Sequence, residues 1–397
     1  MDDAIENVLI LQGGGSLGAF GCGVYKALVN NNIKLDILSG TSIGGLNATV
    51  IAGSKEDHPE ESLENFWMEI ADTSNGNGNI DLNFPFLERS LQEQFPFTLA
   101  SKSTLSFYCS AIYGNRKIFL PRWRPENLFK DPQYFTPSKW TYLYDHSPLV
   151  KTLEKYVDYN KLQPNGKPNA RLIITAVNVM TAEPLIFDSA KQQITPKHVL
   201  ATTAYPTYFF QWVELEKGLF AWDGSLLSNT PLREVIDASP VKDKRIFLVE
   251  NYPKNIEKLP SNLQEVKHRA RDIMFSDKTI HSVHMSKAIT LHLKLIDDMY
   301  EMLEGHFNSE KIEEKEKFEK ISARYKKVSE EHGAEIKGVY YITRDEPFPS
   351  LYENADFSKN AIKASINDGE LKTNRIIKDI QRRYMENDNS ENSSRSF

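Results

Sequence analysis

The first fifty residues alternate between short apolar runs and glycine-rich turns. An apolar run that ends in three glycines predicts a buried strand, and apolar residues spaced three or four apart predict the helix that follows it. The pattern predicts, in order, a strand, a helix, a strand, a sharp turn and a helix, over 8–12, 16–29, 33–39, 40–45 and 46–52. This order is typical of an α/β sandwich with parallel strands.

The middle of the chain returns to strand patterns after a long irregular stretch. Buried or alternating apolar runs predict five further strands, over 171–179, 184–190, 211–216, 219–224 and 245–252. The first two should pair as a hairpin, and so should the next two. We therefore expect an α/β fold with a mostly parallel central sheet. The first 255 residues would form its core.

A charged helical segment follows, over 263–333, and a strand from Lys337 closes it. One apolar face, at Phe318, Ile321, Tyr325 and Val328, is flanked by charged positions that suit ion pairs. It favours either a helix packed on its own domain or a surface that binds a partner.

These patterns predict that the chain is divided into three parts. They are a core over 1–255 with an aromatic-rich cap over 84–147, a helical C-terminal extension with a closing strand over 256–385, and a disordered polar tail over 386–397.

Composition and charge exclude several classes of protein. The 397 residues are 40% hydrophobic, which suits a sizeable core, and the net charge of −6 argues against nucleic-acid binding. Two cysteines, Cys22 and Cys109, provide neither a disulfide framework nor a zinc cluster. The acidic start does not match a signal peptide, and no apolar run reaches the length of a membrane span. We expect a cytoplasmic protein that is soluble or peripheral at membrane or lipid surfaces.

The glycine loop QGGGSLG contains the dinucleotide-binding pattern G-x-G-x-x-G at Gly13, Gly15 and Gly18, after a strand and before a helix. Asp36 lies 18 residues further on, near where an acid that binds ribose belongs. However, Asp36 falls early in the second strand, and the dinucleotide interpretation does not explain the turn GTSIGG that follows. The glycines of AFGCG, just after the loop, also indicate close packing against another element. We therefore favour a different role for this loop.

The turn GTSIGG fits G-x-S-x-G at Gly40, Ser42 and Gly44, the strand-to-helix turn that exposes a serine nucleophile. A side chain at either glycine would collide with the helix or the substrate, and the N-terminus of the helix stabilises negative charge near the serine. A serine that only caps a helix would give the same local pattern.

The two glycine motifs support each other. Adjacent parallel strands would bring Gly13, Gly14 and Gly15 beside Ser42 at one edge of the sheet. Their backbone N–H groups could then form an oxyanion hole, in which losing one donor typically costs about 10²–10³ in rate.

The general base is the next question, because serine is a weak nucleophile until a base takes its proton. Most of the later histidines lie in the charged helical segment, so no Ser-His-Asp triad is apparent. Asp223, in AWDGSLLSNTPL, is the better candidate, because it ends a predicted strand and Gly224 lets the chain turn away from its carboxylate. An ordinary Asp-Gly turn remains the alternative.

Together these motifs resemble the patatin-like phospholipases. The chain has GGGSLG, then GTSIGG about 25 residues later, then an Asp-Gly pair about 180 residues after that, as this family does. The resemblance covers roughly Val8 to Tyr252, and the helical extension is similar to that of a bacterial and archaeal subgroup. It implies a three-layer α/β/α fold and a lipid acyl hydrolase with a Ser-Asp dyad.

Applied to this sequence, the resemblance implies that Ser42 is the nucleophile and Asp223 the general base. It also implies that the three glycines of the loop, Gly13, Gly14 and Gly15, frame the oxyanion hole. Leu17 departs from the family, which usually has a basic residue in this loop, and so removes a positive charge near the oxyanion.

We therefore expect a carboxylic ester hydrolase of the phospholipase A or lysophospholipase type, without metal or cofactor, acting on a lipid or other acyl ester. The cap interleaves aromatic and basic residues, most densely in RKIFLPRWRP, which suits docking on an anionic lipid surface or an apolar lid over the site. Hydrolysis of storage lipids or polyesters, acyl transfer, and a binding protein with a vestigial site remain the alternatives.

Overall fold

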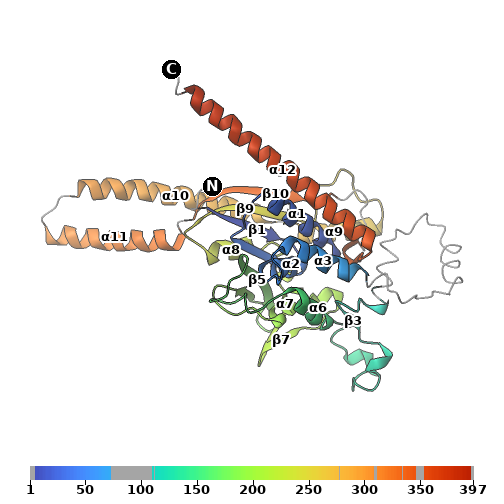
Figure 1. Ribbon diagram of the computed structural model, residues 1–397. Coiled ribbons are helices and arrows are strands. Elements are labelled where there is room, and N and C mark those ends of the chain that lie inside the picture. The colour runs from blue at the N-terminus through green and yellow to red at the C-terminus, as the bar shows by residue number, and fades with distance from the viewer. Residues whose placement is uncertain are drawn as a thin grey trace.

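The computed structural model describes residues 5–72, 110, 112–276, 278–307, 311–332, 334–345 and 353–394. These residues fold around a mixed sheet of eight strands, in the order β10-β9-β1-β2-β5-β8-β7, with β6 also paired to β5 (Figure 1). The strands of this sheet are β1 (Ile5–Leu11), β2 (Ile37–Thr41), β5 (Arg171–Asn178), β6 (Pro184–Asp188), β7 (Val213–Glu216), β8 (Leu219–Asp223), β9 (Asp243–Glu250) and β10 (Ile336–Thr343).

The five strands from β10 to β5 run parallel, whereas β6, β7 and β8 add antiparallel pairings. The helices flank the sheet or project from it (Figure 1). They are α1 (Ala19–Asn30), α2 (Ile43–Ala52), α3 (Pro59–Asp72), α6 (Pro148–Tyr156), α7 (Pro196–Thr203), α8 (Leu232–Ala238), α9 (Leu263–Phe275), α10 (Thr279–His306), α11 (Ile312–His332) and α12 (Lys359–Ser394).

The sheet has a hydrophobic layer on each face. Strand β1 shows the reason, because alternate side chains point to opposite faces. Leu9 and Leu11 join the large core formed with α1, α2, α3, α6, α7 and α12, whereas Val8 and Ile10 join a smaller core with α8 and the start of α10. The fold is therefore the three-layer α/β/α sandwich that the family resemblance implies.

Strand β5 pairs with β2 and β8 along the same edge. Its residues 171–175 pair with β2, and its last three residues pair with β8. Strand β6 pairs with the opposite edge of β5, so β2 and β8 share one edge. They run along it in opposite directions, and their ends face each other. Thr41 is paired with Thr175 and Asp223 with Ala176, so the ends of β2 and β8 meet there.

Close helix packing explains the glycines of AFGCG. A Cβ atom on Gly23 of α1 would lie 1.8 Å from the carbonyl oxygen of Ile366 in α12. One on Gly369 of α12 would lie 2.2 Å from the carbonyl oxygen of Phe20. The two backbones approach so closely that neither position can carry a side chain without moving the helices apart. The close packing that the sequence indicates is thus supplied by the C-terminal helix.

The C-terminal part of the chain contributes to the central sheet as well as to the projecting helices. The strand predicted to close the helical segment is β10, an edge strand that pairs in parallel with β9. Helices α10 and α11 form a hairpin that projects from the body, and α12 projects separately (Figure 1). Helix α12, which the sequence pattern did not predict, runs to Ser394 through most of the segment expected to be a disordered tail.

Part of the aromatic-rich cap is described and part is not. Residues 112–145 include the short paired strands β3 (Leu120–Pro121) and β4 (Tyr144–Asp145). The predicted cap residues 84–109, with Cys109, lie outside the described residues. Cys22 is buried in α1. Among the described helices, none is long and apolar enough to cross a membrane.

Candidate active site

Ser42 occupies a strained turn between β2 and α2. Its backbone has φ 58° and ψ −130°, a combination that a non-glycine residue rarely adopts. A Cβ atom on Gly40 would lie 2.3 Å from the carbonyl carbon of Gly44, and one on Gly44 would lie 2.1 Å from the carbonyl oxygen of Leu11. The two glycines thus permit the sharp turn, and Thr202 Oγ1 accepts a 3.0 Å hydrogen bond from the backbone N–H of Ser42.

The glycine loop lies directly beside this serine. A Cβ atom on Gly13 would be 2.9 Å from Ser42 Cβ, so a side chain there would displace the serine. Gly14 and Gly15 follow with φ of 154° and 60°, in the region that favours glycine. Among the hydrogen bonds found in the described part of the chain, none uses the backbone N–H of Gly14 or Gly15.

Gly13 has a different role from its two neighbours. Its backbone N–H donates a 3.0 Å hydrogen bond to Oδ1 of Asn229, which also accepts one from the Ser225 hydroxyl at 3.2 Å. The Gly13 N–H is therefore already occupied in this structure. Gly13 contributes the close approach to Ser42, and the N–H groups of Gly14 and Gly15 are the ones left for a ligand.

Asp223 ends β8 with its side chain fully buried. Burial destabilises the carboxylate and raises the pKa of Asp223 to about 6, although the Ser42 side chain and the Ser225 backbone N–H and hydroxyl act in the opposite direction. The Ser225 N–H donates to Oδ1 at 2.8 Å. Within the described residues, Oδ2 has no partner of standard hydrogen-bond geometry.

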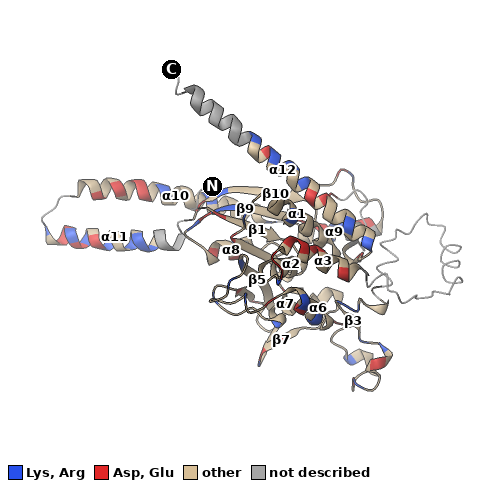
Figure 2. Ribbon diagram, viewed as in Figure 1, with Lys and Arg blue, Asp and Glu red and all other residues tan. Residues whose placement is uncertain are grey.

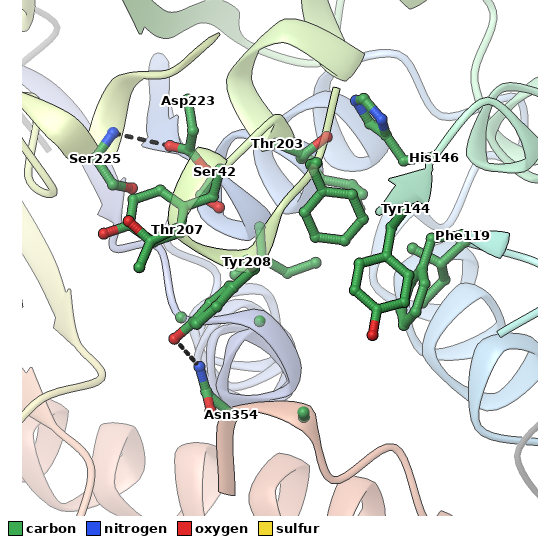
Figure 3. Close-up of a pocket in the computed structure, with 18 of the residues that line it drawn as sticks. Ser42, Phe119, Tyr144, His146, Thr203, Thr207, Tyr208, Asp223, Ser225 and Asn354 are labelled. Carbon is green, nitrogen blue, oxygen red and sulfur yellow. Dashed lines mark hydrogen bonds between the residues drawn. The ribbon is translucent and has the colours of Figure 1, made fainter. Parts of the chain in front are cut away.

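The Ser42 and Asp223 side chains lie next to each other at the pocket wall (Figure 3). Ser42 is close enough to lower the pKa of Asp223, yet the unpartnered Oδ2 shows that the contact is not a well-aligned hydrogen bond. Such contacts often tighten only when substrate binds. The structure thus brings together all the candidate site residues, Gly13, Gly14, Gly15, Gly40, Ser42, Gly44 and Asp223.

Buried polar side chains hold the loop in place. Asn251 donates through Nδ2 to the carbonyl oxygens of Gln12 and Gly13, at 3.0 and 3.1 Å. Gln12 in turn accepts from the Asn251 backbone N–H at 3.0 Å and donates to Thr230 Oγ1 at 2.9 Å. Sequence reasoning missed these supports. The positions of Asn229 and Thr230, just after the Asp-Gly pair, were the only available signal.

An apolar cavity of about 280 Å³ opens in front of the serine. Ser42 and Asp223 lie at one side of it, and His146, Tyr144 and Phe119 lie further along (Figure 3). The lining is mainly aromatic and aliphatic side chains from the cap, from α2 and α6, and from the segment before β7. Such a cavity suits an acyl chain better than a polar group.

The histidines found near the site have other partners. His146 lines the cavity, but its Nε2 is 3.1 Å from the Leu200 carbonyl oxygen, and burial lowers its pKa. His198 belongs to the capping box of α7 and stacks on Phe187. His268 pairs with Asp272 at 3.2 Å. Asp223, which lies against Ser42, is therefore a better candidate for the general base than any of these histidines.

Leu17 packs where a basic residue is usual in the family. It lies in a small cluster with Tyr252 and Phe275. Arg271 of α9 lies over the Tyr252 ring at 5.4 Å, but its charge is balanced by Asp272, at 2.9 Å. A net positive charge near the loop is thus not restored by this arginine.

The dinucleotide interpretation does not fit the geometry. Asp36 precedes β2, at the edge of the sheet opposite the glycine loop, and its Oδ2 accepts a 2.8 Å hydrogen bond from the Asn7 backbone N–H. A ribose-binding acid belongs at the carboxyl end of the strand.

Comparison with known protein families agrees with this geometry. Residues 9–236, more than half of the chain, match the family model described as patatin-like phospholipase. The chain belongs to this family. At family level it is therefore a lipid hydrolase.

Two solved structures are similar at low sequence identity. VipD from Legionella pneumophila is 14% identical, with a TM-score of 0.39, and the match covers 95% of this chain and 67% of VipD. ExoU from Pseudomonas aeruginosa, solved in complex with SpcU, is 16% identical, with a TM-score of 0.28, over 68% of this chain and 49% of ExoU. Curated proteins give no significant match.

Proposed function

We propose that the protein is a serine acyl-ester hydrolase of the phospholipase A or lysophospholipase type, in which Ser42 is the nucleophile and Asp223 the general base. The observation that carries the proposal is the strained Ser42 beside a fully buried carboxylate at the wall of an apolar cavity. A serine that merely caps a helix requires neither the strain nor the carboxylate.

In the first half of the reaction, Asp223 accepts the proton of the Ser42 hydroxyl while Oγ attacks the ester carbonyl carbon. The carbonyl oxygen becomes an oxyanion, and the N–H groups of Gly14 and Gly15 stabilise it. The bond to the leaving alkoxide then breaks, Asp223 returns the proton to that oxygen, and the acyl group stays on Ser42. A pKa of about 6 makes Asp223 a stronger base than an ordinary aspartate and keeps it mostly ionised at neutral pH.

In the second half, a water molecule replaces the alcohol. Asp223 takes its proton as the water oxygen attacks the acyl carbon, and the same N–H groups stabilise the second oxyanion. Collapse breaks the bond to Ser42, which regains the proton from Asp223, and releases a fatty acid. The apolar cavity supports the proposal because it can hold the acyl chain through both steps.

Labelling with a fluorophosphonate ester probe tests the nucleophile. Wild type should label, Ser42→Ala should not, and Asp223→Asn should label at least about tenfold more slowly, because its amide cannot accept the proton. Release of free fatty acid from phosphatidylcholine would show hydrolysis, and transfer of acyl label to an added alcohol would show an acyltransferase instead. Failure of wild type to label, with and without vesicles, would overturn the proposal.

We also propose that the cap over 112–144 contacts the lipid surface. Arg122 organises this segment, because it forms an ion pair with Asp131 at 2.5 Å and lies over the rings of Trp140 and Tyr142 at 5.0 and 4.5 Å. This ordered platform holds Phe129 and Phe135 in solvent, 94% and 77% exposed.

The charge of the cap and its position beside the active site also support contact with a lipid surface. Residues 112–144 contain six Lys or Arg and two acids, in a chain whose net charge is −6. Tyr144 connects the cap to the active site, because it packs against Trp123 at 5.5 Å and lines the cavity. Exposed aromatic rings beside basic side chains favour an anionic bilayer.

Flotation with vesicles of phosphatidylglycerol and phosphatidylcholine tests this contact. The double variant Phe129→Ala/Phe135→Ala should bind at least about fivefold less well and still hydrolyse a soluble short-chain ester at the wild-type rate. The control Leu259→Ala/Leu263→Ala removes two equally exposed side chains elsewhere. Unchanged vesicle binding by the cap variant would contradict the assignment, without bearing on the dyad.

A further inference from the structure

The segment that leads into α12 forms part of the cavity wall. Asn354, Ala355 and Phe357 line the cavity, although they lie well beyond residues 9–236, which match the family model. Asn354 lies directly against the glycine loop, because a Cβ atom on Gly15 would be 2.2 Å from its backbone carbonyl oxygen. The C-terminal part of the chain therefore completes the wall of the active site beside the N–H groups proposed to bind the oxyanion.

The side chain of Asn354 joins this segment to another part of the wall. Its Nδ2 donates a hydrogen bond to the hydroxyl oxygen of Tyr208 (Figure 3). Tyr208 ends the short helical turn η4 (Pro206–Tyr208) and also lines the cavity. While this bond is formed, the wall is continuous from η4 to the glycine loop, so the cavity cannot extend between them.

The two ends of this hydrogen bond are anchored differently. Phe357, three residues after Asn354, is buried in the large core together with residues of α12. Tyr208 is 40% exposed, and the next residue, Phe209, has a φ of 59°, which is unfavourable for a bulky side chain. Loss of the bond would therefore release Tyr208 and leave the core intact.

The size and polarity of the cavity indicate what this wall excludes. Its volume of about 280 Å³ is at the low end of the range for ligand pockets, about 300–1,000 Å³. Among the described residues that line it there is no Lys or Arg, and Asp223 is the sole acid. Basic side chains are dense instead along α11 and α12, which project from the body (Figure 2). The cavity therefore suits one apolar chain, and a charged head group would stay outside it.

We propose that the hydrogen bond between Asn354 and Tyr208 restricts the site to esters with a single acyl chain, so that lysophospholipids are preferred over diacyl phospholipids. This proposal rests on the proposed function, since it requires that Ser42 cleaves a lipid ester. One acyl chain fills the aromatic part of the cavity, near Phe119 and Tyr144. Tyr208 and Asn354 lie on the other side of the cavity, where they block the second chain of a diacyl lipid (Figure 3).

Selectivity between two lipids tests this role. The substrates are palmitoyl lysophosphatidylcholine and dipalmitoyl phosphatidylcholine, each in the same detergent micelles, so that contact with the lipid surface is matched. Wild type should show a kcat/KM at least about tenfold higher for the lysolipid. Asn354→Ala should lower this ratio at least about threefold, mainly through a lower KM for the diacyl lipid, with kcat for the lysolipid within about twofold of wild type.

Two further variants separate the hydrogen bond from a general disturbance. Tyr208→Phe keeps the ring and removes the hydroxyl, so it should change the ratio as Asn354→Ala does, and the double variant should change it no further. Thr207→Val is the matched control, because it removes a cavity hydroxyl on the same turn that lies against Tyr205, and it should keep the wild-type ratio.

The outcomes distinguish this proposal from the proposed function. Equal hydrolysis of both lipids by wild type would overturn the proposal and leave the Ser-Asp dyad in place. An unchanged ratio in Asn354→Ala, or additive effects in the double variant, would also overturn it. Release of no fatty acid from either lipid would overturn the proposed function and this proposal with it.

Discussion

The side-chain oxygen of Asn229 accepts a hydrogen bond from the backbone N–H of Gly13, 216 residues earlier in the chain, at 3.0 Å. Asn229 also donates to the Phe275 carbonyl oxygen at 3.0 Å, so one buried amide connects the glycine loop, the Asp223 turn and the end of α9. The N–H groups proposed to bind the oxyanion therefore depend on a residue that does not itself donate to the substrate.

Asn229→Ala should lower kcat by about 10- to 100-fold with little change in KM, because a displaced loop weakens oxyanion binding more than substrate binding. Steady-state kinetics on a soluble ester measures this. The neighbouring variant Ser228→Ala removes a hydroxyl bonded to the Thr230 carbonyl oxygen and should stay near wild type. Equal losses in both variants would indicate a general disturbance of this turn instead.

The pH dependence of kcat/KM should report the raised pKa of Asp223. The base must be ionised, so the rate should rise about tenfold per pH unit below pH 6 and level off above it. An unperturbed aspartate would level off near pH 4. A profile measured on the soluble ester between pH 4 and 8 distinguishes the two, and a plateau that begins near pH 4 would contradict the assignment.

The raised pKa of Asp223 should also make the free energy of unfolding depend on pH, with the folded state favoured at low pH. The pKa of Asp223 is about 6 in the folded chain and about 4 in the unfolded chain, so the folded state binds more protons between these values. The contribution of Asp223 to the free energy of unfolding is therefore highest below pH 4 and falls as pH rises to 6. Asp223→Asn should be more stable than wild type at pH 7 by about 1–3 kcal/mol, and equally stable near pH 4. Chemical denaturation at the two pH values tests this, and equal stabilities at pH 7 would argue against a destabilised carboxylate.

The crossing of α1 and α12 should not tolerate a methyl group. Gly23→Ala places a Cβ atom 1.8 Å from the Ile366 carbonyl oxygen and should lower the free energy of unfolding by about 1–3 kcal/mol or more. Gly305→Ala is the matched control, because it lies in α10 with nothing within 4 Å and should be neutral or slightly stabilising. Thermal melts of both variants test the contrast, and an unchanged Gly23→Ala would mean that the helices can move apart at little cost.

Local patterns in the sequence were enough to predict an α/β sandwich with parallel strands. The apolar run at Val8 and the turn at Ser42 each encode their structure within a few residues, because a buried strand and a sharp turn have strong local requirements. Helix α12 was not predicted, since its contact with Gly23 joins positions more than 300 residues apart. Only the glycines on one side of that contact gave a signal.

In the candidate site too, some residues could be identified from the sequence and others could not. Ser42 and the glycines could be identified because each needs a particular backbone geometry. Asn229 and Asn251 could not, because a buried amide and a surface amide look alike in a sequence. The occupied N–H of Gly13 is a further example, since its partner lies far away along the chain.

Strand β5 helps to set the distance between Ser42 and Asp223, the two residues of the proposed dyad. It holds β2 and β8 end to end, so its ladder of hydrogen bonds helps to set how far the carboxylate of Asp223 lies from Ser42. A slip of β8 by one residue along β5 would move that carboxylate about 3.4 Å and turn it to the other face of the sheet. The spacing of acid and serine is therefore set by strand register, and substitutions that loosen the β7–β8 hairpin would misalign the pair without touching either residue.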